Sequence, residues 1–158
     1  MNSSFSFSSA TLVSTAALKV VDIFPHNPEQ GLKTSPAQVL LIDGKTGYIS
    51  AILDGTYVTE ARTGAASGAA FDILGKKECR KGAMIGTGGQ AACQLEAMLT
   101  ARELEEVAVY SRNKEKREAF AAEMQEELKE FGTRIYAADS ADEAVEDADL
   151  LITVTGSS

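Results

Sequence analysis

The chain has 158 residues, enough for one domain or for one domain and part of a second. Hydrophobic residues make up 44% of it, which is typical of a soluble globular protein, and no apolar run approaches the ~18 residues of a membrane span. The formal net charge of −8 argues against nucleic acid as a partner, because a phosphate-binding surface would be basic. With one histidine and no Cys-x-x-Cys, we expect no metal site, and we expect Cys79 and Cys93 to be reduced thiols of a cytoplasmic protein.

The first 18 residues are rich in serine and threonine. No positive charge precedes their apolar residues, which argues against a secretory signal, and the lack of arginine argues against a transit peptide. We therefore expect residues 1–18 to form a flexible N-terminus.

The next segment predicts a small strand-rich unit. Residues 19–24 form one expected strand, and residues 39–43 and 48–53 flank a glycine-containing turn as a hairpin. A helix is expected over 61–74, with Thr59 as N-cap and Gly75 as stop. Its inner residues are nearly all small, so it should pack closely on something flat, such as a sheet or a partner chain.

Arg62 is the exception on this small-residue helix. A cation in the first turn faces the positive end of the helix dipole. Arg62 is therefore either simply solvated or a site residue that recovers this cost from an anionic ligand.

The segment Gly86-Thr87-Gly88-Gly89-Gln90-Ala91 follows a short apolar run and opens a predicted helix. Strand, glycine turn and helix are what a dinucleotide site needs. Gly86 allows the tight turn, Gly88 lets the backbone approach a pyrophosphate, and Ala91 is small enough for close helix packing. Free N–H groups and the helix dipole then favour phosphates.

Strands and helices alternate to the end of the chain. Strands are expected at 107–110, 134–136 and 150–154, the last buried on both faces. Helices are expected at 113–131, capped by Asn113 and Gly132, and after Ser140, which opens a capping box. This order predicts a parallel sheet with right-handed crossovers, whose last strand is an edge ready to pair with another chain, so we expect self-association as a dimer.

The end of the second sheet strand selects the cofactor. Ser111 follows Gly89 by 22 residues, and Arg112 comes next, where NAD-specific sites carry an acidic residue. Serine and a guanidinium suit a 2′-phosphate, which favours NADP(H) over NAD(H). The alternative is a surface arginine beside a loop serine.

Further motifs run in order over nearly the whole chain and together resemble the ornithine cyclodeaminase/μ-crystallin family. The segments that carry the resemblance are Lys19-Val20-Val21, Asn27-Pro28, Gly31-Leu32-Lys33-Thr34, Asp43, Thr46-Gly47, Asp54-Gly55, Thr59 to Ala65, Gly86 to Ala91 and Ala148 to Thr155. The combination of Arg-Thr-x-Ala with Gly-x-Gly-x-Gln-Ala is specific to that family.

The resemblance implies an α/β fold with a Rossmann-type parallel sheet, incomplete at the C-terminus, preceded by part of an α+β substrate and dimerisation domain. The expected divisions are 1–18, 19–76 and 77–158. The family has a longer N-terminal part, and a C-terminal part that carries a catalytic aspartate. Asp54, a turn residue, and Asp149, at the start of a strand, are not expected to replace that aspartate.

The resemblance also implies residue roles. Arg62 would hold an amino-acid carboxylate and Lys19 would support proton transfer at the α-carbon. Thr34 would lie near the substrate and nicotinamide. The expected cofactor-binding residues are Thr34, Thr63, Gly86, Gly88, Gly89, Gln90, Ser111, Arg112, Thr153, Val154, Thr155 and Gly156.

The activity implied is that of an NAD(P)-dependent amino-acid cyclodeaminase, in which hydride transfer at an α-carbon gives an imine and ammonia is lost. The alternatives are a ketimine reductase or alanine dehydrogenase of the same family, a non-catalytic μ-crystallin-like nucleotide-binding protein, or a Rossmann fragment without function. A small amino acid or cyclic imine is the expected substrate, and a homodimer the expected assembly.

Overall fold

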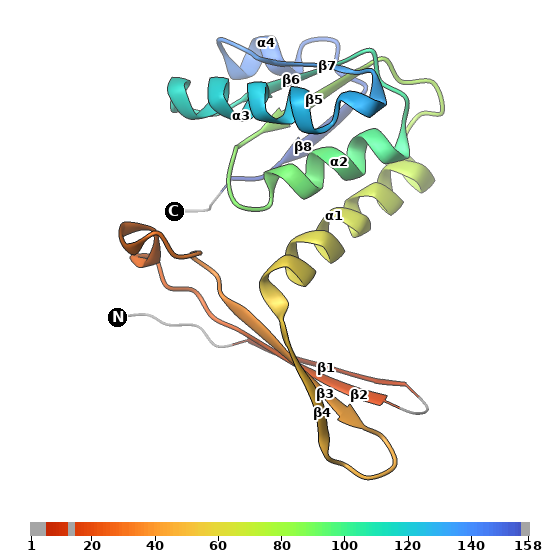
Figure 1. Ribbon diagram of the computed structural model, residues 1–158. Coiled ribbons are helices and arrows are strands. Elements are labelled where there is room, and N and C mark those ends of the chain that lie inside the picture. The colour runs from red at the N-terminus through yellow and green to blue at the C-terminus, as the bar shows by residue number, and fades with distance from the viewer. Residues whose placement is uncertain (1–5, 13–14, 156–158) are drawn as a thin grey trace. The chain divides into compact units, whose positions relative to one another are not determined.

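The computed structural model describes residues 6–12 and 15–155 (Figure 1). The chain divides into two compact units, residues 1–59 and 60–158, which are described separately. This division falls earlier than the expected boundary at 76/77, because the later part of a long helix packs within the second unit. Among the described residues, no helix has the length and apolar character needed to cross a membrane.

The first unit contains a four-stranded antiparallel sheet in the order β1-β2-β3-β4. The strands are β1 (Ser6–Leu12), β2 (Thr15–Val21), β3 (Ala37–Asp43) and β4 (Ile49–Asp54), and the short helix η1 (Asn27–Gln30) precedes β3. The expected flexible start is therefore replaced, over the described residues, by strands. Amino-acid composition does not predict these strands, because they are held by backbone hydrogen bonds between neighbouring strands, and such bonds do not depend on the side chains.

The predicted hairpin is confirmed as β3 and β4. Asp43 closes its turn, because one carboxylate oxygen accepts hydrogen bonds from the backbone N–H groups of Lys45 and Thr46, at 2.9 and 2.8 Å. These bonds, led by that from Thr46, hold the pKa of Asp43 below its usual value. Gly47 takes the left-handed conformation that the turn requires.

Helix α1 (Gly55–Leu74) begins six residues earlier than predicted. The Asp54 carboxylate accepts a hydrogen bond from the Thr56 N–H at 2.8 Å, so Asp54 caps the helix in place of Thr59. Thr59 instead donates its hydroxyl to the Gly55 carbonyl at 2.6 Å. The sequence Asp-Gly fits a turn as well as a cap, which explains the late prediction.

The second unit contains a parallel sheet in the order β7-β6-β5-β8. Its elements are β5 (Lys81–Ile85), α2 (Ala91–Ala101), β6 (Glu106–Tyr110), α3 (Lys114–Glu127), η2 (Lys129–Phe131), β7 (Arg134–Ala137), α4 (Ala141–Val145) and β8 (Leu150–Thr153) (Figure 1). The predicted βα alternation is thus confirmed, and with it the Rossmann-type sheet.

Side chains alternate between the two faces of this sheet. Val107 and Val109 of β6 are fully buried in the larger core with α2 and α3, whereas Ala108 packs with Ala144 of α4 on the other face. The predicted caps are present: Asn113 accepts from the Lys116 N–H, and Ser140 from the Glu143 N–H. The helix ends that the local sequence predicts therefore match the helices that pack on this sheet.

Strand β8 differs from its prediction. Leu150 is buried, but Leu151 is 49% exposed, so β8 is covered on one face only. Helix α4 packs on β5 and β6, the two central strands, and β8 is an edge of the described sheet.

Two of the small residues of α1, Gly64 and Gly68, pack against helix α2. A Cβ added to Gly64 would lie 2.5 Å from the Cys93 carbonyl oxygen, and one added to Gly68 would lie 3.2 Å from that of Ala97. Glycines four residues apart lie on one helix face and allow the backbones of α1 and α2 to approach closely. For these two glycines a second helix takes the place of the expected sheet, because close approach between two helices makes the same demand for small side chains.

Candidate functional site

The candidate site lies at the carboxyl edge of the parallel sheet. The strand order reverses between β5 and β8, and in open α/β sheets ligands bind in the crevice at that point. The loop after β5 carries the glycine motif, and the residues after β8 lie beside it. Three of the predicted cofactor segments, those after β5, β6 and β8, therefore converge on one edge.

Gly86 makes the closest backbone approach in this loop. Its φ is 107°, and a Cβ there would lie 2.4 Å from the Val154 carbonyl oxygen. Only glycine combines that conformation with that contact. Gly86 thus ties the glycine loop to the end of β8, while its N–H donates to the Tyr110 carbonyl at 2.7 Å.

Gly88 and Gly89 lie in an uncrowded part of the loop instead. Both are exposed, and a Cβ on either would meet no described atom closer than 3.6 Å. The Ala91 N–H turns back to the Gly88 carbonyl, whereas in the described part of the chain no backbone acceptor pairs with the N–H of Gly88, Gly89 or Gln90. Unpaired N–H groups and an uncovered backbone at the start of an 11-residue helix are suited to a pyrophosphate, so the residues present fit a dinucleotide.

The loop after β6 is held by side-chain hydrogen bonds. The Thr87 hydroxyl donates to the Ser111 hydroxyl at 3.2 Å, and Ser111 donates to the Asn113 carbonyl at 3.3 Å. Arg112 is exposed. The Ser111 hydroxyl already donates within the protein and would have to break its bond to the Asn113 carbonyl before it could donate to a phosphate. The Arg112 side chain, in contrast, is accessible.

At the end of β8, Thr153 and Thr155 are exposed and Val154 is half-buried. The Val154 N–H donates to the Ile85 carbonyl at 2.7 Å, which keeps this segment alongside β5. Gly156 lies outside the described residues.

The remaining predicted residues divide between the two units. In the first, Lys19 is half-buried on β2 and donates to the Thr59 hydroxyl at 3.4 Å, while Thr34 is exposed and its carbonyl accepts from the Phe24 N–H. In the second, Thr63 is half-buried and Arg62 exposed.

Arg62 is not in the first turn of its helix, because α1 begins at Gly55. The dipole penalty expected for it does not apply, since that effect falls off within one turn. Its guanidinium makes no hydrogen bond or ion pair among the described residues, so it is available to an anion.

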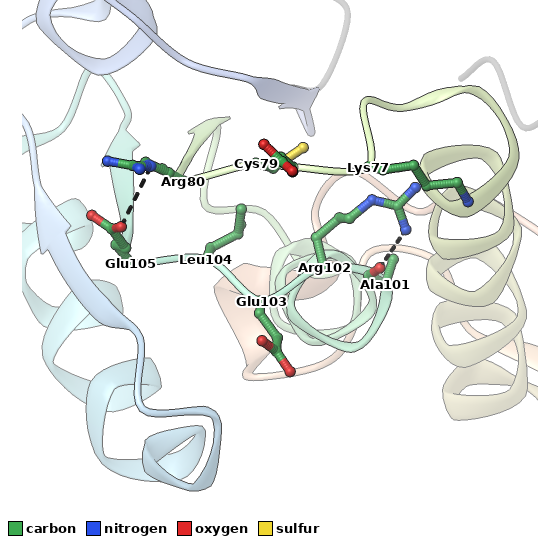
Figure 2. Close-up of a pocket in the computed structure, with 9 residues that line it drawn as sticks. Lys77, Cys79, Arg80, Ala101, Arg102, Glu103, Leu104 and Glu105 are labelled. Carbon is green, nitrogen blue, oxygen red and sulfur yellow. Dashed lines mark hydrogen bonds and ion pairs between the residues drawn. The ribbon is translucent and has the colours of Figure 1, made fainter.

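A hollow of about 650 Å³ lies at the opposite edge of the sheet, between the segments that precede β5 and β6 (Figure 2). Its cations are engaged by protein groups. Arg80 pairs with Glu105 at 3.7 Å, and buried Arg102 donates to Asp72 and to several carbonyls at the end of α1. This hollow is a structural junction that docks α1 onto the sheet unit.

Asp149 lies at the same amino edge. Its carboxylate accepts from the Arg80 and Lys81 N–H groups and from the Lys76 ammonium. These bonds, the Arg80 N–H first, lower the pKa of Asp149 to about 2. Asp149 thus has a structural role, far from the glycine loop in the sheet.

Sequence reasoning missed Arg117. Its side chain is only 7% exposed and contacts the loops after β6 and β7. The signal was available, because Arg117 lies on the apolar stripe of α3 with Phe120, Ala121 and Met124, where a cation needs an explanation.

The parallel sheet and glycine loop define a Rossmann-type nucleotide-binding protein. Residues 6–158 match the ornithine cyclodeaminase/mu-crystallin family, to which this chain belongs. It is 41% identical, over 141 residues, to the Δ1-pyrroline-2-carboxylate reductase of Bacillus cereus, covering 89% of this chain and 42% of that protein.

Two solved structures are also similar. One is the Δ1-pyrroline-2-carboxylate reductase of Thermococcus litoralis in complex with NADH and L-proline (TM-score 0.81, 34% identity), covering 96% of this chain and 51% of that one. The other is a lysine cyclodeaminase studied for recognition of L-lysine, L-ornithine and L-2,4-diaminobutyric acid (TM-score 0.85, 31% identity), covering 98% and 44%. The chain thus spans about half the length of these relatives or less.

Proposed function

We propose that this chain supplies the dinucleotide site and part of the substrate site of an NAD(P)-dependent enzyme that acts at the α-carbon of an amino acid. Reduction of a cyclic imine to a cyclic amino acid is the reaction we favour. The observation that carries the proposal is the uncovered Gly88-Gly89 backbone at the switch point of the sheet. The 41% identity to a pyrroline-2-carboxylate reductase supports the substrate class.

The glycine loop would bind the pyrophosphate through its free N–H groups, with Gln90 at the helix start. Thr153 and Thr155 would line the inner cofactor surface beside it. The bound nicotinamide supplies the hydride chemistry, and the protein orients it.

We further propose that NADP(H) is preferred to NAD(H). Arg112 is exposed at the end of β6, where the adenosine ribose would lie, and no carboxylate occupies positions 111 and 112. An arginine can pair a 2′-phosphate bidentately, while an acidic residue would repel it.

For the substrate, Arg62 would hold the carboxylate in its guanidinium fork, and Lys19 would deliver the proton that the imine nitrogen gains as the hydride reaches carbon. Thr34 and Thr63 would lie near the substrate and nicotinamide. These roles follow from the family resemblance together with the accessibility of Arg62 and the half-buried position of Lys19.

The test of the nucleotide site is isothermal titration of the chain with NADPH and NADH. Gly88→Val should abolish binding of both while leaving the fold intact, because a Cβ there lies 3.6 Å from the Val154 carbonyl oxygen, an ordinary contact, and the side chain covers the exposed backbone. Ala122→Val, on an exposed position of α3, is the matched control and should bind as wild type does. Equal affinity in Gly88→Val and wild type would refute the site.

Turnover assays on the same sample address the reaction. Reduction of a cyclic imine, lost in Arg62→Met and Lys19→Met, would support the reductase. Nucleotide binding without turnover of any amino acid or imine would instead indicate a binding protein of the μ-crystallin kind.

Ornithine or lysine cyclodeamination is the second candidate, favoured by the TM-score of 0.85 to a lysine cyclodeaminase. The products of the two reactions differ. In cyclodeamination the side-chain amine attacks the imine carbon, ammonia leaves, and the reduced nucleotide returns its hydride to the cyclic imine. Release of ammonia from ornithine, without net consumption of nucleotide, would select this activity over the reductase.

We also propose a homodimer. Apolar side chains are exposed on β4, with Ile52 at 68% and Ile49 at 55%, and on β8, with Leu151 at 49%. Such surfaces are suited to a partner. A single monomeric species by light scattering across a concentration series would contradict this assembly.

A further inference from the structure

Arg117 is a buried cation at the carboxyl edge of the parallel sheet. One terminal nitrogen donates to the Ser111 carbonyl at 3.2 Å. The other donates to the carbonyl and carboxylate of Asp139, at 3.5 and 3.4 Å. The guanidinium carbon lies 5.2 Å from the centroid of the Tyr110 ring. A single side chain thus joins the loop after β6 to the loop after β7.

Stability does not account for a cation at this place. Asp139 is 87% exposed, so its ion pair with Arg117 is weakened by water. The Arg117 Nε is buried and has no acceptor among the described residues, which is a cost. An apolar side chain of similar volume on the stripe of α3 would avoid this cost. What arginine alone supplies is the hydrogen-bonded link between the two loops.

The link continues to the glycine loop. Arg117 holds the Ser111 carbonyl, and the Ser111 hydroxyl accepts from Thr87, which stands between the first two glycines of the motif. The hydrogen bond from Arg117 to the Ser111 carbonyl therefore helps to fix the backbone on which the exposed Arg112 lies.

Charge in this segment supports binding of an anion. Residues 111–117 contain four cations, Arg112, Lys114, Lys116 and Arg117, and one carboxylate, Glu115, in a chain whose formal net charge is −8. Local positive potential of this kind attracts a phosphate.

We propose that Arg117 is a positioning residue that fixes the loop of Ser111 and Arg112 for the 2′-phosphate of NADP(H). The proposal rests on the proposed function, since it needs a bound dinucleotide. It predicts an effect on one nucleotide only. Arg112 makes charge-assisted bonds to the phosphate of NADPH, and these depend on its placement, whereas NADH is held mainly through the pyrophosphate.

The test compares the affinity of Arg117→Met and Arg117→Lys for NADPH and NADH by isothermal titration. Arg117→Met should raise the Kd for NADPH about tenfold and that for NADH less than about twofold, because the lost contribution is that of aligned charge-assisted bonds. Arg117→Lys, which keeps the charge but not the two-armed link, should raise the NADPH value about threefold.

Arg134→Met is the matched control. Arg134 also lies over a tyrosine ring, at 4.6 Å, and pairs with a glutamate, but it lies at the amino end of β7. It should leave both affinities unchanged, and thermal melting should show each variant folded.

Equal weakening of both nucleotides, or no change in Arg117→Met, would overturn the positioning role while leaving the nucleotide site standing. If Arg117→Met does not fold, Arg117→Lys is the test. A rise in the Kd for NADPH relative to that for NADH would support the positioning role, and an unchanged ratio would overturn it. If wild type binds neither nucleotide, the proposed function itself fails, and the role of Arg117 falls with it.

Discussion

Replacing Gly64 with alanine should destabilise the protein, against the ordinary expectation for a helix interior. Alanine is the better helix former by about 1 kcal/mol. At Gly64, however, the new Cβ would lie 2.5 Å from the Cys93 carbonyl oxygen and 2.9 Å from its carbon. A relaxed carbon–oxygen contact is about 3.3 Å, so the α1 and α2 backbones would have to separate by about 0.8 Å.

Forcing extra volume into a packed contact costs about 1–3 kcal/mol, and here the obstacle is backbone that cannot swing aside. We therefore expect Gly64→Ala to lower the free energy of unfolding by up to about 2 kcal/mol after the propensity gain. Gly68→Ala is the matched control, because its Cβ would meet the Ala97 carbonyl oxygen at 3.2 Å, a contact that relaxes within a few tenths of an ångström. It should be neutral or stabilising by up to about 1 kcal/mol.

Urea unfolding followed by circular dichroism measures both variants, with the midpoint compared at equal slope. The two substitutions share their chemistry and their helix, so propensity cancels between them. Gly64→Ala as stable as Gly68→Ala would refute the close packing of α1 on α2.

Three further outcomes are expected. The pKa of Asp149 is about 2 in the folded protein and ~3.9 in the unfolded chain. Its carboxylate therefore stabilises the fold above about pH 4 and loses that effect as the pH falls towards 2. Asp149→Asn should lower Tm at pH 7, and the difference in Tm from wild type should disappear between about pH 4 and pH 2. Asn113→Ala removes the acceptor of the Lys116 N–H and should cost about 1 kcal/mol in urea unfolding. Arg102→Met, which removes the hydrogen bonds of a buried guanidinium to the Lys76 and Phe71 carbonyls, should cost about 1–3 kcal/mol in the same assay.

Local signals predicted the second unit well. Asn113 and Ser140 cap their helices as expected, and Gly86 has the positive φ that its place in the motif requires. Each of these depends on neighbours within a few residues, which a sequence displays directly. Sheet order followed because βαβ connections leave few alternatives.

The errors arose where the deciding partner is distant or the local signal has two meanings. Asp54-Gly55 fits both a turn and a helix start, so α1 was begun too late. The partner of Gly64, the backbone at Cys93, comes 29 residues later in the chain. The place of Arg117 on an apolar stripe is visible in the sequence, but its role is not, because its acceptors at Ser111 and Asp139 meet only when β6 and β7 pair.

The close contact of α1 with α2 also bears on the proposed site. Arg62 precedes Gly64 by two residues, and the contact point at Cys93 follows the start of α2 by two residues. The same helix begins directly after the glycine loop, so the packing of Gly64 fixes the arginine proposed to bind substrate relative to the loop proposed to bind cofactor. A side chain at position 64 would shift one against the other, and displacements near 1 Å are large for a reaction that depends on alignment. We therefore expect Gly64 to matter for turnover as well as for stability. Gly64→Ala should lose catalytic efficiency under conditions where it remains folded, while Gly68→Ala should keep it.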